Sequence, residues 1–100
     1  MKLYQYLNQE KREYIISKQL LRSGTSVGAM VREAKHAESK NDFRHKLGIA
    51  QKEINETIYW LELLKETDYL TVAQFQGLNA DAIENIKIIT AILKTLKANN

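Results

Sequence analysis

The stretch from residue 17 to residue 37 places a group of small residues in the middle of an otherwise helical pattern. Its flanks contain the Leu, Val, Lys and Arg residues of an amphipathic helix. A glycine inside a helix costs about 1 kcal/mol relative to alanine, and this group contains two. We therefore expect another backbone or another subunit to approach the helix closely here. The small residues are Ser23, Gly24, Thr25, Ser26, Gly28 and Ala29.

The composition favours long helices joined by short connections. The chain has 100 residues, no proline and 4 glycines, so few positions mark a turn. A chain of this length forms one domain, which we expect to span residues 1–100. The absence of cysteine excludes a disulfide framework, and no apolar run reaches the roughly 20 residues of a membrane span. We expect a cytoplasmic protein without a membrane partner.

Hydrophobic periodicity predicts the tail of one helix in residues 1–8 and three long helices in residues 10–37, 40–66 and 71–97. The clearest apolar stripes run through residues 43–64 and 75–96, and the glycines leave open a kink in the second helix. Ser39 and Thr71 each precede a suitable partner by three residues, which indicates a helix start. Short connections favour antiparallel neighbours, so the predicted fold is all-α, an antiparallel up-and-down four-helix bundle with a shortened first helix.

The third and fourth helices carry more apolar surface than one core requires. Trp60 and Leu63 lie outside the main stripe of the third helix, and Ile88 and Ile92 lie outside that of the fourth. Soluble monomers seldom expose large apolar patches, so these residues favour a homo-oligomer. The alternative is a broader core that closes on the first helix.

Positive charge is concentrated in the first half of the chain. Residues 1–52 contain 11 Lys and Arg against 5 Asp and Glu, whereas residues 53–100 contain 4 against 7. Such a distribution is typical of a surface that contacts phosphates, although no recognition helix or base-stacking platform is evident. The alternatives are a solvated face, or complementary charges on neighbouring helices or subunits. The candidate phosphate contacts are Lys11, Arg12, Lys18, Arg32, Lys35, Lys40, Arg44 and Lys46.

The other charged residues are explained better by structural roles than by catalysis. Arg22 and Glu33 share a helix face but are too far apart to pair with each other, so each is expected to pair with another helix or chain; Glu53 or Glu56 is the candidate partner of Arg22. Glu33 and His36 have the spacing of a di-metal site, but the second pair that such a site needs is missing. We find no nucleophile elbow or phosphate loop, and expect no enzyme activity, cofactor or metal.

Three segments occur in an order that resembles the four-helix bundle proteins of the 23S rRNA-intervening sequence family. They are residues 17–34, the start at residues 37–43, and the segment of residues 49–64. The resemblance implies a homopentamer without enzymatic activity or cofactor. A related branch, the accessory protein of diversity-generating retroelements, is a basic pentamer that binds nucleic acid and a reverse transcriptase.

The resemblance also implies which residues serve fold and assembly. Two departures stand out: family members usually have a longer first helix, and Met30 replaces an Asn that is usual in the small-residue motif. The residues carried over are Arg22, Ser26, Glu33, Glu53, Glu56, Tyr59 and Trp60.

The expected function is therefore that of a non-enzymatic oligomeric bundle, which binds RNA or DNA phosphates as a scaffold or adaptor. The alternative is a protein–protein assembly module that binds no nucleic acid. A protein partner is possible under either interpretation.

Overall fold

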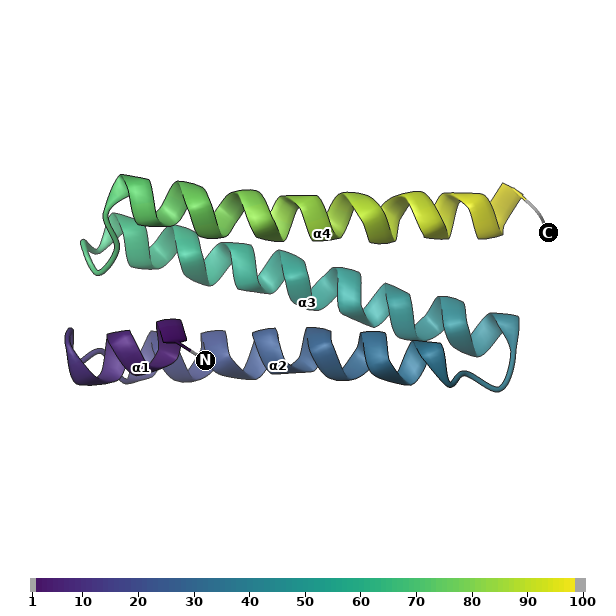
Figure 1. Cartoon of the computed structure of the whole chain (residues 1–100), viewed down its shortest axis with the longest axis horizontal. Coiled ribbons are helices and arrows are strands. Elements are labelled where there is room, and N and C mark those ends of the chain that lie inside the picture. The colour runs from purple at the N-terminus through teal and green to yellow at the C-terminus, as the bar shows by residue number, and fades with distance from the viewer. Residues whose placement is uncertain (1, 99–100) are drawn as a thin grey trace.

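The computed structural model describes residues 2–98, and these residues form four α-helices. α1 spans Lys2–Gln9, α2 Ile15–Lys35, α3 Lys40–Glu66 and α4 Val72–Ala98. Successive helices run in opposite directions, so the α1–α2 and α3–α4 turns lie at one end of the molecule and the α2–α3 turn at the other (Figure 1). This is the predicted all-α, up-and-down arrangement, and its first helix is short as expected.

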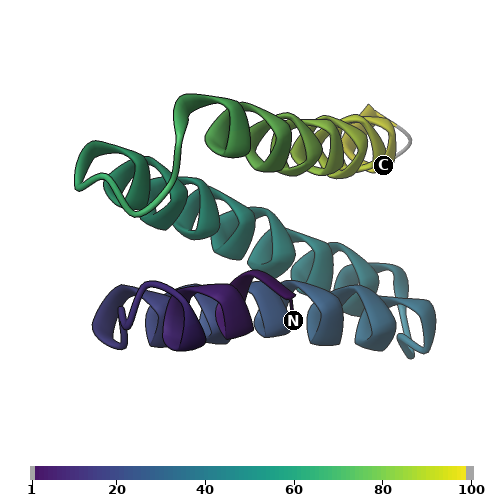
Figure 2. The same ribbon diagram turned by 60° about the vertical axis from the view of Figure 1, so that its left-hand side comes forward.

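Each helix packs on the next one in the chain. α1 lies on α2, α2 on α3 and α3 on α4, whereas the backbones of α2 and α4 do not approach each other within the described residues. α3 crosses between them, as Figure 2 shows. The result is an elongated bundle of 47 × 21 × 16 Å that is open between α2 and α4.

The core follows the stripes predicted for α3 and α4. One cluster of buried side chains surrounds Leu64 and joins α1, α2, α3 and the start of α4. A second cluster surrounds Ala50 and joins α2, α3 and the middle of α4. Because α3 supplies buried residues to both clusters, it is the central element of the fold.

The helix α2 begins later than expected, because residues 10–14 form a capped turn. The carboxylate of Glu13 accepts hydrogen bonds from the backbone N–H groups of Ile15, Ile16 and Ser17, at 3.2, 3.0 and 2.7 Å. These N–H groups have no partner inside the helix, so the carboxylate satisfies them as an N-cap does. Glutamate is an unusual residue for this role, and the sequence pattern therefore gave no helix start here.

The predicted starts of α3 and α4 are confirmed. Ser39 Oγ accepts the N–H of Asp42 at 3.0 Å. Thr71 and Gln74 form a reciprocal capping box, in which each side chain accepts the backbone N–H of the other, at 3.1 and 2.9 Å. Such reciprocal bonds satisfy two unpaired donors at once and fix where the helix begins.

The small-residue segment of α2 is helical throughout, and no break interrupts it at the glycines. Ser23 is fully buried, and its hydroxyl lies 2.9 Å from that of Thr57 on α3. Gly28, in contrast, has no atom of another residue within 4 Å of the place where a Cβ would lie. The expected close approach of another backbone is therefore absent at Gly28 within one chain.

Candidate functional site

The α2–α3 end, formed by residues 32–46 and the last turns of α4, gathers a group of exposed cations. α2 finishes with Arg32 and Lys35 in its last turn, where the helix dipole stabilises positive charge. α3 begins at Lys40 after a short turn. All three residues are exposed, and no ion pair within residues 2–98 involves them. They are available to an anionic partner.

Two of the predicted phosphate contacts at this end are engaged within the protein. Arg44 donates from Nη2 to the backbone carbonyl of Leu96 at 3.5 Å, which joins α3 to the last turns of α4. Lys46 Nζ lies 3.3 Å from the carboxylate of Glu33 and joins α3 to α2. Both cations are partly buried. They hold helices together, so they are less available to phosphate than the exposed cations around them.

The fold adds two cations to this end that the sequence analysis missed. Lys94 and Lys97 are exposed in the last turns of α4, which finishes at the same end of the molecule as the α2–α3 turn (Figure 1). The contact between Arg44 and Leu96 brings these turns against α3. Because α3 and α4 are antiparallel and equally long, the predicted topology alone could have placed these lysines.

Acidic side chains also lie at the α2–α3 end and give it a mixed surface. An open hollow of about 390 Å³ contains both signs of charge, so it is unsuited to a single small anion. Within the described residues, no group of three His, Cys, Asp or Glu is placed to hold a metal ion. The exposed cations around the hollow suit an extended polyanion better. The hollow is lined by Arg32, Glu33, His36, Glu38, Asp42 and Lys46.

The remaining predicted phosphate contacts lie at the opposite end of the molecule. Lys11 and Arg12 belong to the α1–α2 turn, and Lys18 lies in the first turns of α2. The length of α2, roughly 30 Å at 1.5 Å per residue, separates them from the α2–α3 end. Arg22, which would connect the two groups, is paired with glutamates. The predicted phosphate contacts therefore lie in two separate basic regions, one at each end of α2.

The expected ion pair of Arg22 is present, and it involves both candidate partners. The guanidinium of Arg22 on α2 donates a hydrogen bond to Glu56 on α3 and lies 3.3 Å from the carboxylate of Glu53. The hydrogen bond from Arg22 lowers the pKa of Glu56, and the same bond raises the pKa of Arg22. The cluster joins the polar edges of two helices. Ser26, one turn further along α2, is half-buried.

The residues predicted for assembly differ in how far they are exposed. Ile88 and Ile92 are 51% and 37% exposed on the outer face of α4. On α3, Tyr59 is exposed and packs edge-to-face with Trp60, at 4.9 Å between ring centroids. Trp60 and Leu63 are half-buried. The single chain therefore leaves part of the surplus apolar surface uncovered, mainly on α4.

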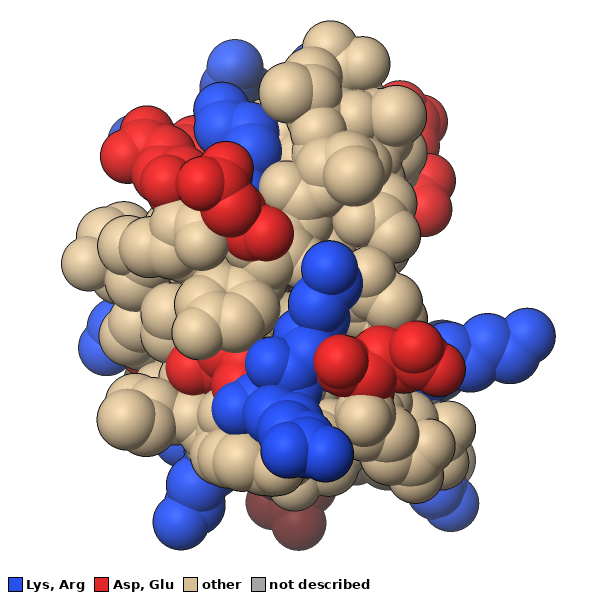
Figure 3. Space-filling view, turned by 90° about the vertical axis from the view of Figure 1, so that its left-hand side faces the viewer, with Lys and Arg blue, Asp and Glu red and all other residues tan. Residues whose placement is uncertain are grey.

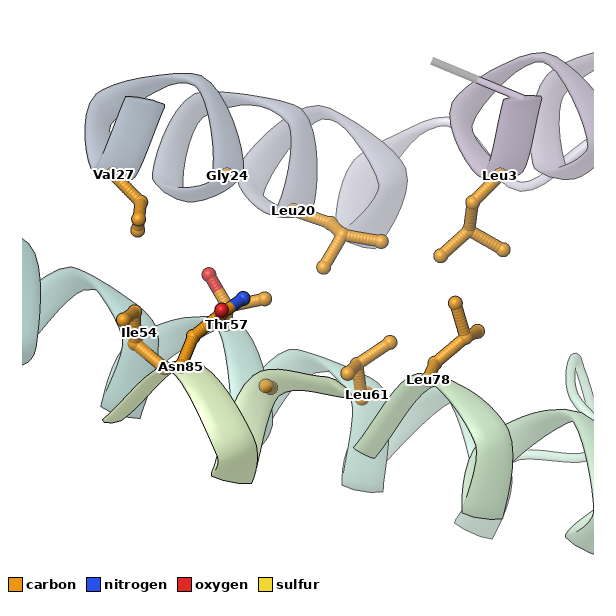
Figure 4. A pocket seen from close by; sticks show the side chains of 10 residues that line it. Leu3, Leu20, Gly24, Val27, Ile54, Thr57, Leu61, Leu78 and Asn85 are labelled. Atoms are coloured by element: carbon orange, nitrogen blue, oxygen red, sulfur yellow. The ribbon is translucent and has the colours of Figure 1, made fainter. Parts of the chain in front are cut away.

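An apolar groove opens between α2 and α4 above α3. Leu3, Leu20, Leu61 and Leu78, from the four helices, project into it (Figure 4). Its cavity volume is about 250 Å³, and Thr57 and Asn85 are polar groups in a lining that is otherwise mostly aliphatic. The groove adds to the apolar surface that one copy of the chain exposes.

None of the helices in residues 2–98 has the length and apolar character needed to cross a membrane.

The fold defines a class: small, all-α bundle proteins in which each helix packs on the next one in the chain. A family model described as 23S rRNA-intervening sequence protein matches residues 1–91. The chain therefore belongs to the 23S rRNA-intervening sequence protein family, as its sequence motifs predicted.

A solved structure extends the likeness to the whole fold. It is the crystal structure of a protein with unknown function from the S23 ribosomal protein family of Bacteroides thetaiotaomicron. That protein is 52% identical in sequence, with a TM-score of 0.91, and the match covers 93% of this chain and 86% of that one. No curated protein matches this chain.

Proposed function

We propose that the protein is a non-enzymatic, oligomeric scaffold that binds the phosphates of RNA or DNA through its α2–α3 end. The observation that carries this proposal is the group of exposed cations that three helices bring to that end. Lysine and arginine on helices contact phosphates without reading bases, so the binding is weakly sequence-selective. The cations are Arg32, Lys35, Lys40, Lys94 and Lys97.

The exposed apolar surface supports the oligomeric part of the proposal. Ile88 and Ile92 and the groove between α2 and α4 are apolar surfaces that a second copy would cover. In a homopentamer, the state that the family resemblance implies, every copy contributes its own basic end. Several weak phosphate contacts then act together, which strengthens binding without any new contact within one copy.

The titratable groups support a protein without enzymatic activity. Arg22 and Glu56 show clear pKa shifts, and the main cause of both is the hydrogen bond that they share. Perturbed groups indicate catalysis when they line a cleft, whereas this pair lies on the surface between two helices. The shifts are thus explained by helix pairing, and we assign no reaction, cofactor or metal to the protein.

The decisive experiment compares two charge-matched double variants in binding to a labelled RNA duplex over a range of salt concentrations. One carries Lys35→Ala and Lys40→Ala at the α2–α3 end, and the other carries Lys52→Ala and Lys87→Ala at exposed positions elsewhere. Each phosphate contact contributes about 0.9 to the slope of log affinity against log salt. We expect the first variant to lower the slope by about 2 and the second to leave it unchanged. An absence of binding at low salt would reject the proposal.

A protein–protein assembly module is the second candidate function. The exposure of Tyr59, Ile88 and Ile92 favours it, because aromatic and aliphatic side chains dominate the energetics of protein interfaces. This function predicts assembly that is insensitive to salt and no affinity for RNA or DNA. Native mass measured in the presence and absence of nucleic acid distinguishes the two functions.

A further inference from the structure

In the α1–α2 turn a charged residue is buried and its two apolar neighbours are exposed, which is the reverse of the usual arrangement. Glu13 is only 7% exposed, whereas its neighbours Tyr14 and Ile15 are 58% and 79% exposed. A charged residue is seldom buried without partners, and two adjacent large apolar residues are seldom projected into solvent together. The turn therefore directs its carboxylate inward and presents an aromatic and an aliphatic side chain at the end of the molecule.

A network of hydrogen bonds holds the turn in this conformation. The backbone N–H of Glu13 donates to the carbonyl of Leu7 at 2.8 Å, and its carboxylate caps α2. Asn8 Nδ2 donates to Ser17 Oγ at 3.2 Å, which ties the end of α1 to the start of α2. Arg12 has φ of 54°, in the left-handed region that favours glycine. The surroundings thus determine the conformation, and Tyr14 is presented by a well-fixed backbone.

Exposed cations flank the exposed pair in the sequence. Lys11 and Arg12 precede it in the turn, and Lys18 follows one helical turn after Tyr14. The ammonium group of Lys11 also lies 5.9 Å from the ring centroid of Tyr6. Figure 3 looks onto this end, with the α1 and α2 side at the bottom, and shows a group of Lys and Arg atoms at its centre and others around its lower half, with Asp and Glu atoms beside the central group. The turn therefore combines exposed positive charge with an exposed ring.

We propose that the α1–α2 turn binds single-stranded nucleic acid. Tyr14 stacks on an unpaired base, Ile15 packs beside it, and the cations of the turn contact the phosphates on either side. This is the combination by which proteins bind single strands without reading their sequence. A base inside a duplex offers no free face to such a ring. The inference rests on the proposed function. It adds a preference for unpaired bases, which the phosphate contacts of the α2–α3 end do not provide.

A nucleic acid fits this surface better than a lipid bilayer does. Helices that lie in a membrane surface bury a long apolar face, whereas among the described residues of the α1–α2 turn and the first turn of α2 the large apolar side chains that project into solvent are those of Tyr14 and Ile15. The sequence pattern did not indicate a stacking platform, because Tyr14 lies inside the predicted second helix, where nothing marks it as exposed. The roughly 30 Å of α2 separates this turn from the α2–α3 end. An RNA that combines a duplex with an unpaired segment would contact both the α2–α3 end and the α1–α2 turn.

The test uses the full chain, a labelled oligouridylate and a labelled RNA duplex of the same length, with binding followed by fluorescence anisotropy. Tyr14→Leu keeps an apolar side chain but removes the ring, and Tyr14→Phe keeps the ring. We expect Tyr14→Leu to weaken binding to the single strand about tenfold and Tyr14→Phe to leave it within about twofold of the original. Neither variant should alter duplex binding or the thermal unfolding of the protein, since the side chain is exposed.

The outcomes separate this inference from the proposed function. If Tyr14→Leu binds the single strand as well as the original protein while duplex binding persists, the inference is wrong and the proposed function stands. If neither RNA binds at low salt, and a DNA duplex and a DNA single strand of the same length do not bind either, both are wrong. A parallel titration with vesicles of phosphatidylserine and phosphatidylcholine tests the lipid alternative. Binding to those vesicles that survives Tyr14→Leu, without binding to oligouridylate, would overturn the inference in favour of a membrane surface.

Discussion

Glu13 and Ser17 are joined by two hydrogen bonds. The backbone N–H of Ser17 donates to the Glu13 carboxylate at 2.7 Å, and the Ser17 hydroxyl donates to the Glu13 carbonyl at 2.7 Å. Both residues are buried, so water is poorly placed to replace either bond. The α1–α2 turn and the first turn of α2 therefore form one cooperative unit.

Replacing Glu13 by alanine should destabilise the protein by about 1–2 kcal/mol. The variant loses the cap of α2 and leaves the buried N–H of Ser17 without a partner. Urea unfolding followed by circular dichroism measures the change. Glu10→Ala, at an exposed position in the same turn, is the matched control and should stay within about 0.5 kcal/mol of the original. Equal unfolding midpoints for the two variants would contradict the role of Glu13.

The Arg22–Glu56 pair should make stability depend on pH. The pKa of Glu56 is lower in the folded protein than its ordinary value, so the unfolded state takes up a proton first as the pH falls. The contribution of the pair is therefore complete above the ordinary pKa of a glutamate and is lost as the pH falls through the lower, folded value. Urea midpoints measured from neutral pH down to about pH 3 should show this loss.

The matched variants for the pH experiment are Glu56→Gln and Glu62→Gln. Both positions lie on α3, and Glu62 is exposed and has no ion pair within residues 2–98. Glu56→Gln should flatten the dependence of the midpoint on pH, whereas Glu62→Gln should preserve it. The same pH profile in both variants would show that the pair with Arg22 is not responsible.

A charge placed on the outer face of α4 should prevent the proposed oligomer from forming. In Ile88→Asp and Ile92→Asp a carboxylate would have to be buried in the interface, which is costly without a partner. Sedimentation velocity should show a smaller species for both variants. Val72→Asp is the control, because Val72 is 60% exposed and an acid in the first turn of a helix is well tolerated. If the unsubstituted protein itself sediments as a monomer, this prediction is wrong.

Gly28→Ala should distinguish an isolated helix surface from one that a second copy covers. A methyl group at Gly28 meets nothing within the chain, so the helix propensity of alanine should stabilise one copy by about 1 kcal/mol. Gly77 has an equally open position on α4, and Gly77→Ala is the matched control. If a neighbouring copy packs at Gly28, that variant alone should weaken the oligomer while stabilising the dissociated chain. Chemical unfolding and native mass, measured on both variants, test this.

The sequence predicted local features of the fold well. Ser39 and the Thr71–Gln74 pair marked the starts of α3 and α4, because capping is encoded within a few neighbouring residues. The apolar stripes of α3 and α4 follow from helical spacing in the same way. The cap by Glu13 escaped prediction, since a glutamate in this position also fits a helix interior and only its burial reveals its role.

Features that depend on contacts between distant segments were harder to predict. Arg22 was correctly expected to pair with Glu53 or Glu56, because opposite charges on adjacent polar faces have few other partners. The contact of Arg44 with a backbone carbonyl of α4 could not be predicted, since it depends on the exact stagger of α3 and α4. The position of Lys94 and Lys97 at the α2–α3 end, in contrast, follows from the topology, because α3 and α4 are antiparallel and equally long.

The packing of each helix on its sequence neighbour also has a consequence for how quickly the chain folds. Contacts between consecutive helices close short loops, so little chain entropy is lost before each contact forms. Helical proteins of such low contact order fold in microseconds to milliseconds. Because α3 packs against both α2 and α4, the chain can form one pair of adjacent helices at a time. The proposed oligomer would then assemble from copies that are already folded.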